Sequence, residues 1–163
     1  MNFPVKEIAQ KLSAINATLA VAESCTGGLL AGALTDFPGA SDFFRGGVVT
    51  YATETKTDIL GISEELIARF GVVSAECAEA MAQTVAEKFH TDFALSTTGI
   101  AGPGGGTPKT PVGTVFIGIC TPQGLSSVKL NAKGTTRGTV RLEAVALALT
   151  TLSELVSKNS STG

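Results

Sequence analysis

The chain has 163 residues, the usual size of one domain and enough to enclose a core between a sheet and its helices. Hydrophobic residues make up 44% of the sequence and charged residues 16%, a balance that favours a compact fold over intrinsic disorder. The formal net charge of −2 provides no positive field to hold a polyanion, so we expect no nucleic acid partner.

The sequence also predicts a cytoplasmic protein that makes no membrane contact. The first residues lack the apolar stretch of a signal peptide, and no later run approaches the ~20 apolar residues that span a bilayer. Cys25, Cys77 and Cys120 form neither a CxxC pair nor a metal spacing, which fits reduced thiols and predicts no metal and no cofactor. We expect a single domain over residues 1–158 and a frayed tail over 159–163.

Helices and strands alternate along the first half of the chain. Apolar residues at steps of three and four predict the opening helix, and Pro38 with Gly39 ends the second one. Thr53 or Thr55 is expected to cap the third helix, and Ser63 the fourth. In chain order, the sequence predicts a helix over 5–15, a buried strand over 18–24, a turn and helix within 24–37, a strand over 46–52, and short helices over 54–61 and 63–71.

The second half adds a clear helix, a glycine-rich loop, a hairpin and a long last helix. Ser74 is expected to cap the helix over 74–90, and Pro122, Gln123 and Gly124 to join the two hairpin strands. Strands are predicted over 93–99, 113–121 and 125–132, with a loop over 100–111 and a helix over 134–158. The expected fold class is therefore a three-layer α/β/α protein whose mixed sheet is covered on both faces.

Ser24 lies where the first buried strand ends and a helix is expected to begin. A hydroxyl there lies near free backbone N–H groups, which can stabilise an oxyanion. A plain helix-capping role fits the position equally well, and Thr26 competes for it. Gly27 and Gly28 either admit a ligand phosphate or only let the helix pack close to the sheet.

A nucleophilic serine needs a base, and the sequence offers two kinds. His90, the one histidine, lies at the end of a helix, where a structural or surface role is expected. A lysine is the alternative, provided that burial or a neighbouring cation removes its proton. Lys56 follows a strand and is the best placed, although most lysines are solvated. Tyr51, the one tyrosine, relays a proton, orients the lysine or simply packs on a helix.

Two further regions are candidates for binding a ligand. The loop TTGIAGPGGGTPKT matches neither a P-loop nor a dinucleotide fingerprint, but its N–H groups suit an anion or a flat ring; a flexible connection is the alternative. Arg137 and Arg141 lie one turn apart near the start of the last helix, where they oppose the helix dipole. A phosphate and a carboxylate partner fit them equally.

The segments AESCTGGLLAGALTDFPGAS, RGGVVTYATETK, GVVS, STTGIAGPGGGTPKTPVGTV and GTTRGTVR together resemble the CinA C-terminal-domain family. The resemblance implies an amidohydrolase that deamidates nicotinamide mononucleotide to nicotinate mononucleotide and ammonia. It implies Ser24 as nucleophile, Lys56 as base and Tyr51 beside them. The candidate substrate-binding residues are Thr26, Gly27, Gly28, Thr98, Gly99, Ile100, Ala101, Gly102 and Arg137.

The resemblance also sets expectations for mechanism and assembly. Neutral Lys56 would take the Ser24 proton, and N–H groups at the start of the next helix would hold the oxyanion. Family members often have Ser-Asn where this chain has Ala52 and Thr53, although Thr53 can still cap a helix. The chain looks like a stand-alone form that makes a homo-oligomer such as a dimer. The rival functions are a non-catalytic nucleotide-binding module and an interaction protein linked to competence or damage.

Overall fold

The computed structural model describes residues 1–160, with side chains described through Lys158. Within residues 1–160, every helix is too short or too polar to cross a lipid bilayer. The elements are α1 (Val5–Ala14), β1 (Leu19–Glu23), α2 (Leu29–Thr35), the 3₁₀ helix η1 (Ala40–Asp42), β2 (Phe44–Val49), α3 (Thr53–Asp58), α4 (Glu64–Phe70), α5 (Ala75–Phe89), β3 (Phe93–Gly99), β4 (Thr114–Thr121), β5 (Gly124–Asn131) and α6 (Arg137–Ser160).

The five strands form one mixed sheet in the order β2-β1-β3-β4-β5. β1 pairs in parallel with both β2 and β3, whereas β3 with β4 and β4 with β5 are antiparallel. All five residues of β1 are buried, as expected for a central strand covered on both faces. The chain leaves β1 first toward β2 and later toward β3, so the strand order reverses at β1. Open α/β sheets hold ligands beyond the carboxyl ends of their strands at such a point.

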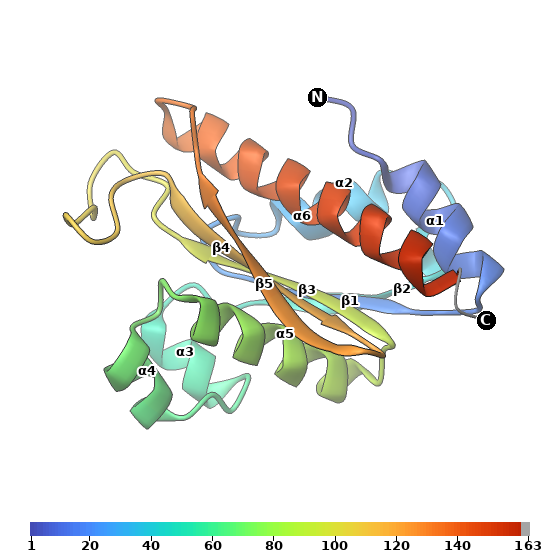
Figure 1. Cartoon of the computed structure of the whole chain (residues 1–163), viewed down its shortest axis with the longest axis horizontal. Helices are drawn as coiled ribbons and strands as arrows, with labels where there is room; N and C mark the ends of the chain where they lie inside the picture. Colours follow the sequence, from blue (N-terminus) through green and yellow to red (C-terminus); the bar gives the residue numbers. More distant parts are fainter. Residues whose placement is uncertain (161–163) are drawn as a thin grey trace.

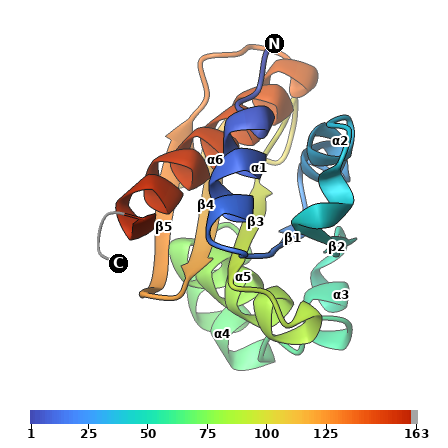
Figure 2. The same ribbon diagram turned by 90° about the vertical axis from the view of Figure 1, so that its right-hand side faces the viewer.

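Helices cover both faces of the sheet, which confirms the predicted three-layer α/β/α class. α1, α2 and α6 lie on one face, and α3, α4 and α5 on the other (Figures 1 and 2). Ile8, Leu30 and Leu149 pack with Val21 and Ile117 in the first core cluster. The second core cluster is smaller and contains Ala22, Ala94, Met81 and Val85. Successive residues along a strand therefore pack into different core clusters, one on each face of the sheet.

The contact of α5 with β4 leaves no room for a side chain at Gly118. A Cβ added there would lie 2.0 Å from the carbonyl oxygen of Ala78 in α5. The hydroxyl of Ser96 bridges the same contact, because it donates to Ala78 O at 2.5 Å and accepts from Gly118 N at 3.2 Å. Glycine therefore sets the distance between the helix and the sheet at this point.

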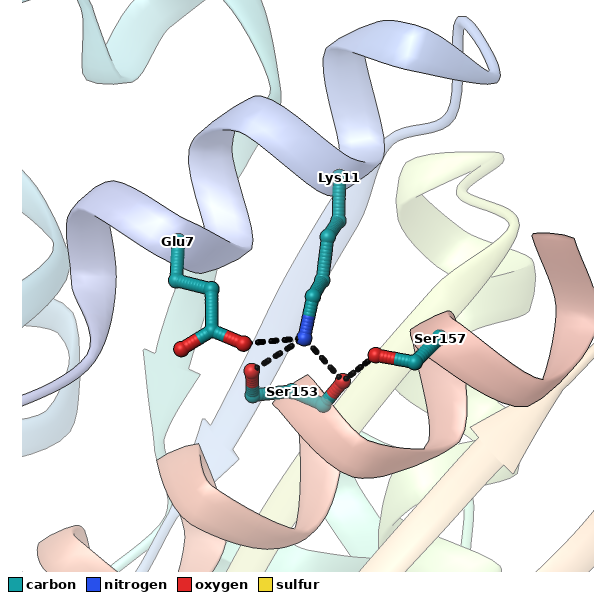
Figure 3. Close-up of polar contacts among 4 residues, drawn as sticks. All are labelled: Glu7, Lys11, Ser153 and Ser157. Carbon is teal, nitrogen blue, oxygen red and sulfur yellow. Dashed lines mark hydrogen bonds and ion pairs between the residues drawn. The ribbon is translucent and has the colours of Figure 1, made fainter.

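The first and last helices lie side by side and are joined by one lysine (Figure 3). Lys11 Nζ pairs with Glu7 on α1 and donates to both the carbonyl oxygen and the hydroxyl of Ser153 on α6, each at 2.9 Å. Ser157 Oγ donates to the same carbonyl at 2.9 Å. This network ties the beginning of the fold to its end.

Several element boundaries differ from the predicted ones, and three of these differences bear on the site or on the chain ends. α2 begins five residues beyond Ser24, because Gly27 and Gly28 have φ angles of 57° and 100°, which a right-handed helix excludes. β2 covers 44–49 rather than 46–52, since its ladder with β1 ends at the Glu23–Val49 pair. α6 covers 137–160 rather than 134–158, and Thr136 Oγ accepts from Thr139 N at 3.2 Å before its first turn. The expected frayed tail is thus helical through Ser160, and residues 161–163 lie outside the described residues.

The predicted helix caps are right at two helices and wrong at a third. Ser63 Oγ accepts from Leu66 N and Ser74 Oγ from Cys77 N, each at 3.1 Å. The third helix, α3, has Ala52 as its N-cap and therefore no side-chain cap, so neither Thr53 nor Thr55 fills that role. A serine at position 52 would offer the missing acceptor, which typically contributes about 1 kcal/mol.

Candidate active site

Polar residues gather at the carboxyl edge of the three parallel strands. Glu23, the last residue of β1, pairs with Val49 of β2 and Thr97 of β3. The next residue, Ser24, is fixed by a hydrogen bond from its N–H to Thr97 O at 2.9 Å, and Thr50 N donates to Glu23 O at 2.9 Å. The residues that follow β1 and β2 therefore meet at one edge.

The antiparallel strands bring two more segments to the same edge. β4 begins where β3 ends, with Gly99 opposite Val115, so the glycine-rich loop over 100–113 lies here. β5 ends opposite Thr114, and α6 starts a few residues later with Arg137. The loop projects beyond the sheet, in yellow at the left of Figure 1.

These segments enclose a pocket of about 360 Å³, within the usual range for small-molecule sites. Its lining residues come from the turns after β1 and β2, from α3, from the segment before α5, from β3 and its loop, and from α6. They are Ser24, Cys25, Tyr51, Thr53, Lys56, Val72, Val73, Thr98, Gly99, Ile100, Ala101, Gly102, Gly104, Gly105 and Arg137.

The centre of the pocket is a serine–lysine pair. Lys56 is 1% exposed, and its Nζ lies 2.9 Å from Ser24 Oγ and donates to Thr50 O at 2.7 Å. In the part of the chain that the structure describes, no carboxylate forms an ion pair with this amine. Burial lowers the pKa of Lys56 below its ordinary value, an effect that Cys77 and Cys25 partly oppose. The solvated-lysine alternative is therefore wrong.

The histidine has the surface place predicted for it. His90 is exposed and forms the C-cap of α5 with a φ angle of 52°. It does not line the pocket that holds Ser24. Lys56 is thus the basic group that the fold brings to the serine.

Ser24 is not a helix cap, because a glutamate occupies that role for α2. The carboxylate of Glu23, 1% exposed, accepts from Leu30 N at 2.8 Å and Ala31 N at 3.0 Å. Glu23 therefore already binds two of the N–H groups at the start of this helix, where the sequence predicts the oxyanion site. The N–H groups of Cys25 and Thr26 in the preceding turn donate to no other residue among those described.

The two arginines of α6 have different contacts, and neither pairs with a carboxylate among the described residues. Arg137 donates from Nη1 to Gly102 O at 2.8 Å and from Nη2 to the hydroxyl of Tyr51. Arg141 donates to the carbonyls of Cys25, at 3.2 Å, and Thr26, at 2.7 Å. Arg137 therefore lies in the pocket, while Arg141 holds the turn behind it.

Tyr51 lines the same pocket as Lys56 but is largely exposed. Its side chain is 57% exposed, and its hydroxyl accepts from Arg137. No hydrogen bond joins it to Lys56 in the described part of the chain. The geometry thus gives Tyr51 no direct contact through which to orient the lysine, and its exposure contradicts the packing alternative.

The predicted substrate-binding residues fall into two groups. Thr98, Gly99, Ile100, Ala101, Gly102 and Arg137 all line the pocket, whereas Thr26, Gly27 and Gly28 do not. Thr98 donates its hydroxyl to Val72 O at 2.6 Å, which fixes β3 to the segment before α5. Gly102 has a φ angle of 81°, and a Cβ there would lie 2.4 Å from Val112. Close packing holds this part of the loop.

Sequence reasoning missed several residues of the site. Cys25, Val72 and Val73 line the pocket but are apolar and carry no local signal. Glu23 did carry one, since it is a charged residue inside the buried strand LAVAE, directly before the turn. A buried carboxylate needs hydrogen-bond donors, and the nearest free ones are at the start of α2.

A larger hollow of about 800 Å³ lies between α1 and α6 but offers no comparable chemistry. Its buried polar groups belong to the network in which Lys11 pairs with Glu7 and Ser153 (Figure 3). Among the residues that the structure describes, no three His, Cys, Asp or Glu side chains are grouped to hold a metal ion.

The fold and the site together define a three-layer α/β/α protein with a buried serine–lysine pair at the point where the strand order reverses. The chain belongs to the CinA C-terminal domain family, which matches residues 2–156.

Relatives of known sequence and structure agree. A CinA-like protein of Fervidobacterium nodosum is 49% identical over 119 residues, which are 73% of this chain and 29% of that protein. The chain spans about three tenths of the length of the curated relatives it matches. A CinA superfamily protein from Klebsiella pneumoniae has a TM-score of 0.90 and 32% identity, over 94% of this chain and 96% of its own. A competence or damage-inducible protein from Enterobacter asburiae has a TM-score of 0.91 and 30% identity, over 96% and 99%.

Proposed function

We propose that this protein is an amidohydrolase that converts nicotinamide mononucleotide to nicotinate mononucleotide and ammonia. The observation that carries the proposal is the Ser24–Lys56 pair, in which a buried amine with no ion-pair partner among the described side chains lies 2.9 Å from a hydroxyl. A buried amine tends to be neutral, and a neutral amine can accept the proton of a serine. The choice of substrate comes from the family resemblance.

The proposed reaction uses the serine and the lysine in turn. Neutral Lys56 takes the Ser24 proton as Ser24 Oγ attacks the carboxamide carbon, and the carbonyl oxygen becomes an oxyanion. The tetrahedral intermediate collapses, the C–N bond breaks, and protonated Lys56 gives its proton to the leaving amine, which departs as ammonia. Lys56 then takes a proton from water as the resulting hydroxide attacks the acyl carbon. When the bond from that carbon to Ser24 Oγ breaks, Lys56 returns the proton to Ser24, and the acid product loses its proton to solvent and leaves as the carboxylate.

The charges around the pocket suit a phosphorylated substrate. Among the described residues that line the pocket there is no Asp, Glu or His, and Arg137 contributes a positively charged guanidinium. That side chain now binds two neutral oxygens, Gly102 O and the hydroxyl of Tyr51. A phosphate is a stronger acceptor for a guanidinium than either, so a nucleotide phosphate would take their place.

Ammonia release by the purified protein given nicotinamide mononucleotide tests the proposal. Ser24→Ala is the control for contaminating amidase, because it removes the nucleophile and keeps the pocket. Ammonia from the native protein but not from Ser24→Ala is the expected result. Tight nucleotide binding without ammonia would instead favour a non-catalytic binding module.

Activity should rise with pH. Because burial lowers the pKa of Lys56 from 10.5, its neutral form is present at a lower pH than for a solvated lysine. Below the folded-state pKa, kcat/KM should rise about tenfold per pH unit, and above it a plateau should follow. The unfolded chain binds more protons between that pKa and 10.5, so the free energy of unfolding should also rise with pH there. A rate that falls as pH rises through this range would contradict a lysine base.

Arg137→Ala should mainly weaken nucleotide binding. Loss of a charged hydrogen bond to phosphate costs about 1.5–3 kcal/mol, so KM should rise about tenfold or more. Steady-state kinetics give the value, with Arg69→Ala as a matched control because Arg69 is exposed on α4 and does not line the pocket. An unchanged KM in a folded Arg137→Ala protein would remove Arg137 from the binding site.

A further inference from the structure

The carboxylate of Glu23 fixes the turn that carries Ser24 through several hydrogen bonds. Besides Leu30 N and Ala31 N, this carboxylate accepts the hydroxyl of Thr26 at 2.6 Å. Thr26 Oγ1 also lies 2.7 Å from Thr97 Oγ1, and Thr97 O accepts Ser24 N at 2.9 Å. All of these side chains are buried, so the bonds are made in a region of low dielectric constant.

The same turn is held from the other side through its carbonyl oxygens. Ser24 O accepts from Gly27 N at 3.1 Å, and Cys25 O accepts from Arg141 Nε at 3.2 Å. Thr26 O accepts from Arg141 Nη2 at 2.7 Å. Arg141 reaches this turn from α6, more than a hundred residues later in the chain.

Peptide planarity converts these carbonyl contacts into a direction for the N–H groups. The carbonyl of Ser24 and the N–H of Cys25 belong to one planar trans peptide, and so do the carbonyl of Cys25 and the N–H of Thr26. In such a unit the carbonyl and the N–H point in opposite directions. Fixing Ser24 O and Cys25 O therefore fixes the N–H groups of Cys25 and Thr26 away from Gly27 N and Arg141.

We propose that Glu23, Thr26 and Arg141 are positioning residues that clamp this turn, so that the N–H groups of Cys25 and Thr26 form the oxyanion site beside Ser24. The proposal rests on the proposed acyl-transfer function. It explains why these two N–H groups donate to no other described residue, while Glu23 binds the donors of α2. A developing oxyanion would find two fixed donors one and two residues from the nucleophile.

Two variants release the clamp from opposite sides. Arg141→Met keeps an unbranched apolar stem but removes the donors to Cys25 O and Thr26 O. Thr26→Val keeps the shape but removes the hydroxyl that joins Glu23 to Thr97, and Thr26→Ser restores it. Arg69→Met and Thr35→Val are matched controls, because both residues are exposed and neither contacts the turn.

The readouts are kcat, KM, the affinity for nicotinate mononucleotide and the rate at which a fluorophosphonate labels Ser24, measured where circular dichroism shows each variant folded. Labelling displaces fluoride and forms a tetrahedral phosphonate ester whose polar phosphoryl oxygen takes the place of the oxyanion, so it reports the oxyanion site without the substrate. We expect Arg141→Met and Thr26→Val to lose about tenfold or more in kcat and in labelling rate, with KM and product affinity within about threefold. Thr26→Ser and the controls should stay near the native values.

The outcomes separate this proposal from the proposed function. Native-like kcat and labelling in folded Arg141→Met would overturn the clamp even if Thr26→Val failed to fold. Losses confined to KM and product affinity would overturn it as well, because they would indicate a binding role. If native Ser24 is labelled but nicotinamide mononucleotide releases no ammonia, the substrate is wrong and the labelling series still tests the clamp. If native Ser24 is not labelled at all, both proposals fail.

Discussion

Lys56→Arg and Lys56→Ala should each lose at least ~100-fold in kcat while still binding nucleotide, because positioned proton transfer contributes at least that much. Arginine keeps the positive charge but cannot lose its proton near neutral pH, so it cannot act as the base. The buried position of Lys56, 2.9 Å from Ser24 Oγ, makes this comparison sharp, since no solvent stands between the two groups. Steady-state kinetics and a separate binding measurement give the two quantities.

Substitutions of Ser24 and of Lys56 should lower kcat by similar and non-additive amounts, because the nucleophile and its base act together. Ser24→Ala should be as slow as either Lys56 variant, and the Ser24→Ala/Lys56→Ala double variant should be little slower than the single ones. Lys88→Arg on the exposed side of α5 is the matched control and should be unaffected. A Lys56→Arg protein with near-native kcat would exclude the lysine base, and additive losses in the double variant would show independent roles.

Gly118→Ala should destabilise the fold by about 3 kcal/mol, at the upper end of the usual cost of overpacking. The new Cβ would lie 2.0 Å from Ala78 O and 2.4 Å from Ser96 Oγ, and the first of these atoms is backbone. α5 must therefore move away from β4, which breaks the bridge made by the Ser96 hydroxyl. Denaturant unfolding measures the loss as a lower midpoint at an unchanged slope.

Gly32→Ala is the matched control for that change. Gly32 is an exposed residue of α2, and an added Cβ there would have no heavy atom within 4 Å. Alanine in place of a helical glycine should stabilise by about 0.5–1 kcal/mol. The two substitutions are chemically identical, so opposite signs would show that the contact of α5 with β4 causes the loss. A neutral Gly118→Ala would mean that this contact can widen freely.

The sequence alone determined the layers of this protein and the residues at the centre of its site. Periodicity and turn residues act over a few positions, so they were sufficient to predict each α-helix and strand in order and the cap at Ser74, but not the short 3₁₀ helix η1. Ser24 and Lys56 were candidates because each follows a predicted strand, and the resemblance to the CinA C-terminal-domain family selected them as nucleophile and base.

Only the tertiary structure decided whether those residues are buried and which residues they bond to. Whether Lys56 is solvated or buried depends on which segments cover α3, and local sequence does not contain that information. The start of α2 was misplaced because two glycines with positive φ angles delay the helix, and Glu23 then binds its free donors. Arg141 reaches Cys25 and Thr26 across 116 and 115 residues. Hydrogen bonds of this kind arise from packing between layers, so short-range pattern and propensity cannot predict them.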